Sequence, residues 1–136
     1  MAKTRILSKS IGFAALIGGV ALLPLQAGAA DLSGEIANAA QHAGLAAQAS
    51  DITGVHTHLH HTVNCLVGPS GSGFDAKELN PCANSGNGAI PDAVMPAEKK
   101  ALQAAAAKAE TGIASANYPA AQKIASDTAA MLNAVK

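Results

Sequence analysis

The chain has 136 residues, of which 49% are hydrophobic, 13% are charged and only 2% are aromatic, and its formal net charge is zero. This length suits one domain, and a chain without an excess of basic residues lacks the positive patches on which nucleic-acid recognition depends. Nucleic-acid binding is therefore not expected, and the core must be built from aliphatic side chains.

Residues 1–30 have the pattern of a secretory signal peptide. Three positive charges precede an apolar stretch (11–25), and the sequence Ala-Gly-Ala at 27–29 predicts cleavage that leaves Ala30 or Asp31 as the new N-terminus. The alternative is a membrane anchor, but the apolar stretch is short for a span of about 20 residues. We expect removal of this segment, a periplasmic or secreted location, and no membrane segment in the mature protein.

Residues 31–136 then form one small domain, in which six lysines face nine acidic residues for a net charge of about −3. About a quarter of these residues are alanine. Alanine favours helices and lets them approach closely, but each alanine buries little area. With Phe74 and Tyr118 as its only aromatic residues, such a thin core would gain from a covalent link.

Cys65 and Cys82 are the only two cysteines. In an exported protein, cysteines pair by default, and closing a loop of this length stabilises the fold by about 3 kcal/mol. The alternative is that both are thiolate ligands of a metal ion. We expect a Cys65–Cys82 disulfide.

The segment Leu32–Val67 is predicted to be helical, with room for a break near Ser50-Asp51. Asp31 or Ser33 can cap its start, and Gly68-Pro69 ends it because proline cannot continue a helix. Apolar residues at spacings of seven, seven, four and three predict one buried stripe. These residues are Leu45, Ile52, Leu59, Val63 and Leu66.

Turn-forming glycine, asparagine and proline predict a long loop over residues 68–95. A loop of this length in a small domain is usually functional or tied down. The disulfide would tether this loop to the end of the helix that precedes it. Three apolar side chains of the loop are expected to cover the core: Phe74, Leu79 and Ile90.

The C-terminal part is again predicted to be helical. Pro96 suits a first helical position, residues 97–116 favour a helix, and Asn117-Tyr118-Pro119 breaks it. A last helix over about 120–135 is expected to bury Ile124, Met131, Leu132 and Val135. The predicted fold is all-α, a small alanine-rich antiparallel bundle of three or four helices.

Histidines give the clearest functional signal, because His56, His58, His60 and His61 lie within six positions. Imidazole is the commonest protein ligand for zinc, copper and nickel. On a continuous helix, His56 and His60 share one face, with His42 within about 40° of the same line. His58 and His61 then face the other way, so all four cannot bind one ion.

Two candidate sites follow. The His56/His60 pair has the spacing by which one helix supplies two imidazoles to a metal, and it borders the apolar stripe, which favours a buried site. The His58/His61 pair favours an exposed site beneath the loop. The loop carboxylates that could complete its ligand set are Asp75, Glu78 and Asp92.

The sequence thus predicts a small exported protein that binds a transition metal, copper or zinc first and nickel next, as a chaperone, buffer or sensor. One alternative is a structural module that self-associates or binds a periplasmic protein and uses its histidines to respond to pH. Another is a bundle that holds haem non-covalently, since no C-x-x-C-H motif for covalent attachment occurs.

Catalysis is not expected. The glycine-rich stretch 68–73 lacks the Gly-Lys-Ser/Thr end of a phosphate-binding loop, and no serine stands in a G-x-S-x-G elbow.

Overall fold

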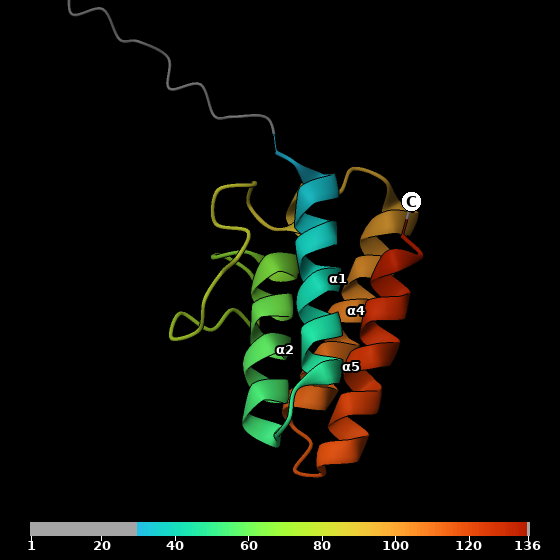
Figure 1. The fold of residues 1–136 in the computed structure, drawn as a ribbon. Helices are drawn as coiled ribbons and strands as arrows, with labels where there is room; N and C mark the ends of the chain where they lie inside the picture. Colours follow the sequence, from blue (N-terminus) through green and yellow to red (C-terminus); the bar gives the residue numbers. More distant parts are fainter. Residues whose placement is uncertain (1–29, 136) are drawn as a thin grey trace, which may run out of the picture.

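The computed structural model describes residues 30–135, so the predicted signal peptide lies outside the described residues except for Ala30. Four main helices pack antiparallel (Figure 1). They are α1 (Leu32–Gln48), α2 (Ile52–Val67), α4 (Pro96–Ile113) and α5 (Tyr118–Asn133), and a short α3 (Ala89–Asp92) lies in the long loop. Because no strand occurs among residues 30–135, the predicted all-α bundle is confirmed.

A break separates α1 from α2 at the predicted position. Ala49 is extended, and the side chain of Asp51 accepts a hydrogen bond of 2.8 Å from the backbone N–H of Gly54, which caps the start of α2. Asp31 caps α1 in the same way through Gly34. The two helices therefore form a hairpin rather than one continuous rod, and histidines on both can face one another.

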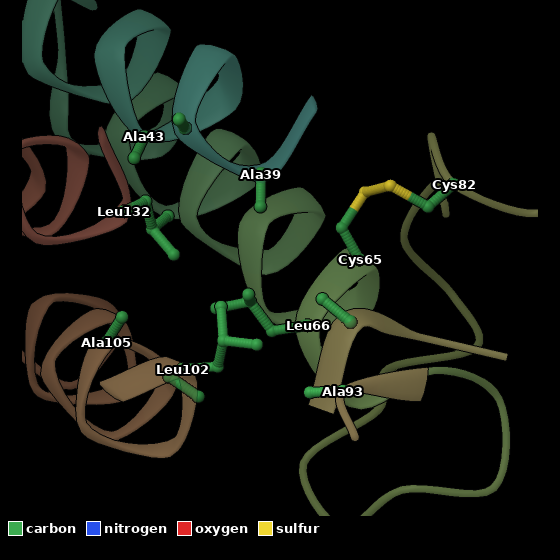
Figure 2. Close-up of a cluster of buried hydrophobic side chains, with 12 residues drawn as sticks. Ala39, Ala43, Cys65, Leu66, Cys82, Ala93, Leu102, Ala105 and Leu132 are labelled. Carbon is green, nitrogen blue, oxygen red and sulfur yellow. A yellow bond between two sulfur atoms is a disulfide. The ribbon is translucent and has the colours of Figure 1, made fainter. Parts of the chain in front are cut away.

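The core differs from the predicted apolar stripe at Leu45, which is 40% exposed. The helix break changes the register, and α1 instead buries a row of small residues. Leu59, Val63 and Leu66 of α2 are buried as predicted, and Ile52 is partly buried. Figure 2 shows two of the α1 alanines facing the leucines of the other helices. The buried alanines of α1 are Ala39, Ala40, Ala43 and Ala46.

The last two helices also differ from the prediction at their ends. α4 ends at Ile113 rather than near residue 116, and α5 begins at Tyr118 because the side chain of Asn117 caps it through the N–H of Ala120. Among the predicted core residues of α5, only Leu132 is fully buried, and Ala121, Ala125 and Thr128 fill the rest of the interface. Ile124, Met131 and Val135 are half-buried.

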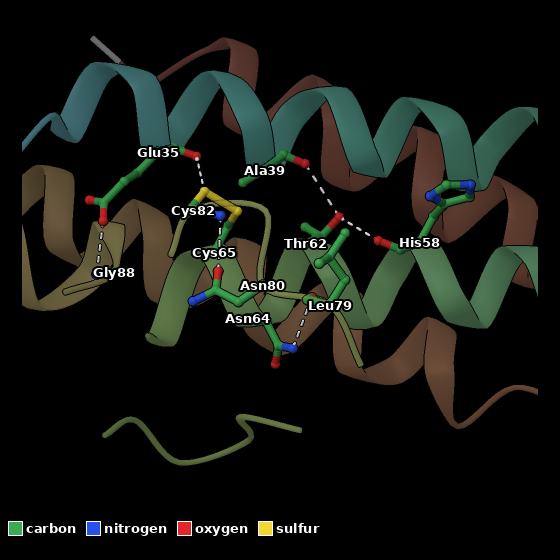
Figure 3. The surroundings of a disulfide bond; sticks show 10 residues. All are labelled: Glu35, Ala39, His58, Thr62, Asn64, Cys65, Leu79, Asn80, Cys82 and Gly88. Atoms are coloured by element: carbon green, nitrogen blue, oxygen red, sulfur yellow. Dashed lines mark hydrogen bonds between the residues drawn. A yellow bond between two sulfur atoms is a disulfide. The ribbon is translucent and has the colours of Figure 1, made fainter. Parts of the chain in front are cut away.

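The Cys65–Cys82 disulfide is present, with the two Cα atoms 5.1 Å apart, so the predicted tether of the loop is confirmed (Figure 3). Gly68 ends α2 with a φ of 67°. The expected apolar cover is wrong for Leu79, which is 61% exposed, whereas Ile90 packs against the core and Phe74 is half-buried. Within residues 30–135, no helix has both the length and the apolar character to cross a membrane.

Candidate metal centre

Three histidines from two helices meet at one side of the α1–α2 hairpin. His42 comes from α1, and His58 and His61 come from α2. One ligand nitrogen from each lies within 4.8 Å of the other two, and the ring centroids are 5.0 to 5.6 Å apart. In Figure 3, the ring of His58 points from α2 toward α1. These residues, the histidine triad, could hold a metal ion.

The hairpin brings the triad together because small side chains line the contact between its helices. Ala39 and Ala43 of α1 are fully buried and flank His42. The hydroxyl of Thr62 donates to the carbonyl oxygens of Ala39, at 3.3 Å, and of His58, at 3.0 Å (Figure 3). Thr62 thus joins the backbones of the two helices beside the triad and fixes their relative position.

The distance between His42 and His58 suits metal coordination. A zinc ion bound tetrahedrally at about 2.0–2.1 Å from each nitrogen separates its ligand nitrogens by about 3.3–3.4 Å. The Nδ1 atoms of His42 and His58 already lie 3.3 Å apart. Since His42 and His58 are half-buried and His61 is 8% exposed, solvent can reach one side of the triad. The described residues thus offer three protein ligands at this point, and no fourth His, Cys, Asp or Glu of residues 30–135 joins the group.

Burial and mutual repulsion favour the neutral rings that bind metals. Desolvation lowers the pKa of His61, and a positive charge on His58 would lower it further, although Glu78 opposes both effects. Desolvation also lowers the pKa of His42, with smaller contributions from His61 and His58. Neutral imidazole is therefore favoured at neutral pH in the folded protein.

His61 has one engaged and one unengaged ring nitrogen. Its Nε2 lies 3.6 Å from a carboxylate oxygen of Glu78, whereas its Nδ1 is buried and has no hydrogen-bond partner. Metal-binding histidines commonly present their second nitrogen to a carboxylate in this way. The unpartnered Nδ1 is thus the nitrogen of His61 that a metal ion would satisfy.

The structure divides the predicted site residues differently from the sequence. His42 joins His58 and His61 because its predicted alignment with His56 required a continuous helix. His56 instead bonds the carbonyl oxygen of Ser115 at 2.9 Å, and His60 lies 3.8 Å from Asp75. The His56/His60 pair is not joined by a third ligand among the described residues.

Among the loop carboxylates, only Glu78 lies beside the triad. Asp75 faces His60, and Asp92 accepts hydrogen bonds from the backbone and side chain of Asn87. Sequence reasoning missed Thr62 and Asn64, which are both fully buried. The sequence could have indicated them, because threonine and asparagine disfavour helix interiors, and a buried polar side chain requires a hydrogen-bond partner.

A scan against protein-family models, a search of curated proteins and a search of solved structures all find no match. The interpretation of the triad therefore depends on its own geometry and chemistry.

Proposed function

We propose that this protein binds a transition-metal ion at His42, His58 and His61 and acts outside the cytoplasm as a metal chaperone, buffer or sensor. The observation that carries the proposal is the meeting of three imidazoles from two helices, with ligand nitrogens within 4.8 Å. Two histidines one turn apart are common on a helix and are weak evidence for a metal site. A third histidine from another helix is stronger evidence, because only the folded structure brings it close to the other two.

Copper and zinc are the favoured ions, followed by nickel. Nitrogen ligands of this kind suit all three, and affinity generally rises from nickel to copper. The spacing of the His42 and His58 nitrogens corresponds to a tetrahedral edge, which favours zinc or copper(I) over square-planar ions.

An exchangeable site fits a carrier or sensor better than a structural metal. Structural zinc sites are closed by four protein ligands, whereas the triad has three and borders solvent. A partner protein could supply the missing ligand during transfer. The signal-like pattern of residues 1–30 supports a role after export.

Non-covalent haem is a weaker candidate. Cavities of about 500 Å³ and 610 Å³ occur within the described residues, the first between α1 and α5 and the second beneath the loop. No histidine lines either cavity. Axial ligation by the triad would therefore leave the macrocycle without an enclosing pocket.

The deciding experiment uses mature protein that is exported and purified without a histidine tag. Its metal content is measured by mass spectrometry, its absorption spectrum is recorded, and the metal-free form is titrated with zinc and copper(I) in competition with a chelator. One equivalent of metal bound in wild type and lost in His58→Ala supports the proposal. A Soret band would favour haem, and failure to take up any of these metals would overturn the proposal.

A further inference from the structure

The long loop has a second anchor besides the disulfide, and that anchor holds the carboxylate which faces the triad. We propose that Asn64 is the positioning residue of the metal site: it fixes the turn 75–79 so that Glu78 orients His61. This inference rests on the proposed function for its effect on metal affinity, but its structural part can be tested in metal-free protein.

Asn64 lies on the side of α2 that faces the loop, and its side chain makes several hydrogen bonds to the loop backbone. It is fully buried, and its side-chain amide donates to the carbonyl oxygens of Asp75, Glu78 and Leu79, at 2.9, 3.3 and 3.1 Å. Its side-chain oxygen accepts from the N–H of Asp75 at 2.9 Å. One side chain thus satisfies both ends of the turn 75–79, and Figure 3 shows the contact with Leu79.

The hydrogen bonds of Asn64 fix the position of Glu78. The backbone carbonyl oxygen of Glu78 accepts a hydrogen bond from Asn64, and the Glu78 carboxylate lies 3.6 Å from Nε2 of His61. His61 precedes Asn64 by three residues on α2. The Cys65–Cys82 disulfide holds the next part of the loop, and Asn80 stabilises it by accepting from the N–H of Cys82. The turn is therefore fixed at both ends against the helix that bears the site.

The expected consequence is control of the His61 tautomer. A carboxylate near Nε2 favours the ring form that carries its proton on Nε2, which leaves Nδ1 unprotonated for the metal. Without Asn64, three carbonyl groups and one N–H of the turn lose their partner, and the turn can move away. Glu78 would then no longer fix the ring. Loss of such a supporting partner typically costs 10–100-fold in metal affinity.

The test is a double-mutant cycle in the full mature protein with Asn64→Ala, Glu78→Ala and the combined variant. Zinc affinity is measured by chelator competition, and the tautomer of His61 is measured by ¹⁵N NMR of the metal-free protein. Two matched controls remove a buried hydroxyl from α5 and an exposed carboxylate from α4: Thr128→Ala and Glu110→Ala. Circular dichroism checks that each variant is folded.

We expect each single variant to weaken zinc binding 10–100-fold and the combined variant to bind no more weakly than Glu78→Ala, because Asn64 acts through Glu78. His61 should change from the Nε2–H form to a mixture in both single variants, but not in the controls. If Asn64→Ala does not fold, Asn64→Ser, which keeps a buried hydrogen-bonding group, takes its place under the same criteria.

Affinity losses that multiply in the combined variant, or an unchanged His61 tautomer in Asn64→Ala, would overturn the inference. If wild-type protein binds no metal, but the His61 tautomer still changes in Asn64→Ala and Glu78→Ala, only the proposed function would be overturned. The two ideas can thus fail separately.

Discussion

Nδ1 of His42 lies 3.3 Å from Nδ1 of His58, although the residues are sixteen positions apart on different helices. In the metal-free protein this distance is that of a weak hydrogen bond, in which one ring donates its N–H to the other. The same distance suits two nitrogens on a tetrahedral ion. A metal ion that replaces the shared proton therefore requires little rearrangement of the helices.

Comparing the zinc affinities of His42→Ala and His56→Ala should distinguish the histidines of the triad from a histidine outside it. His42→Ala removes the only ligand from α1, so zinc affinity should fall by more than the 10–100-fold typical of a lost supporting group. His56→Ala should leave zinc affinity within about threefold but lower the free energy of unfolding by about 1 kcal/mol, since the bond to the Ser115 carbonyl is lost. Chelator competition and urea unfolding measure the two effects. A large loss of zinc affinity in His56→Ala would contradict the assignment.

Without metal, the triad should make stability depend on pH. Burial holds the pKa values of His42 and His61 below their ordinary value of 6.5 in the folded state. The unfolded chain therefore binds more protons, and this contribution to stability is complete above about pH 6.5 and lost as pH falls below it.

The comparison that isolates this contribution is between wild type and His42→Gln/His61→Gln, unfolded in urea at pH 7.5 and 5.5. Wild type should lose stability relative to the double variant at the lower pH. Thr128→Ala, which removes a buried hydroxyl and no titratable group, is the control and should keep the wild-type dependence. If wild type and the double variant show equal pH dependence of stability, the pH dependence does not come from His42 and His61.

Glu35 should contribute with the opposite sign. It is fully buried in α1, its Oε1 accepts from the N–H of Gly88, and its Oε2 has no partner. Burial raises its pKa above the ordinary 4.5, and the charges of Asp92 and Asp31 add to this, although the Gly88 bond opposes it. Its contribution is thus complete below about pH 4.5 and lost as pH rises through the higher folded value. Glu35→Gln should raise the melting temperature at pH 7, and the gain should vanish at pH 4; a gain that persists at pH 4 would contradict this account.

Reduction of the disulfide should destabilise the protein without unfolding its helices. A crosslink across 17 positions stabilises by about 3 kcal/mol, chiefly through the unfolded chain. Urea unfolding with and without a reducing agent should show a lower midpoint for the reduced form. Because Asn64 holds the loop independently, helical circular dichroism in the absence of urea should be unchanged. An unchanged midpoint would mean that the link does not constrain the unfolded chain.

Two helical glycines should respond to alanine in opposite ways. A methyl group at Gly44 would meet nothing within 4 Å, so Gly44→Ala should stabilise by about 0.5–1 kcal/mol through helix propensity. A methyl group at Gly112 would lie 2.6 Å from Leu59 Cδ1 and 3.0 Å from Ile124 Cγ2, so Gly112→Ala should destabilise by about 1–3 kcal/mol. Thermal unfolding of the two variants measures the difference, and equal shifts would mean that the α4 contact is not tight.

The fold could be predicted from local signals. Helix caps at Asp31 and Asp51, the stop at Gly68 and the proline at residue 96 act within a few residues, so the elements followed from the sequence. The disulfide followed because the chain has one pair of cysteines. Leu45 was wrongly expected to be buried, because a helical projection cannot be extended across the break at Ala49.

The ligand set was only partly predictable for the same reason. His58 and His61 share a face of α2 by spacing alone, but the approach of His42 depends on how the hairpin folds back. Glu78 was one of three candidates, and its selection depends on the turn that Asn64 holds. These are contacts between distant elements, and no periodicity within one helix encodes them.

The hairpin has a consequence for the order of assembly. His42 and His61 belong to adjacent helices joined by a connection of only three residues, Ala49–Asp51. Closing a loop this short is among the fastest events in folding, whereas docking α4 and α5 requires contacts between more distant parts of the chain. The ligands therefore depend on low-contact-order structure that precedes α4 and α5 in the chain. Metal capture by the nascent hairpin would couple loading of the site to folding itself.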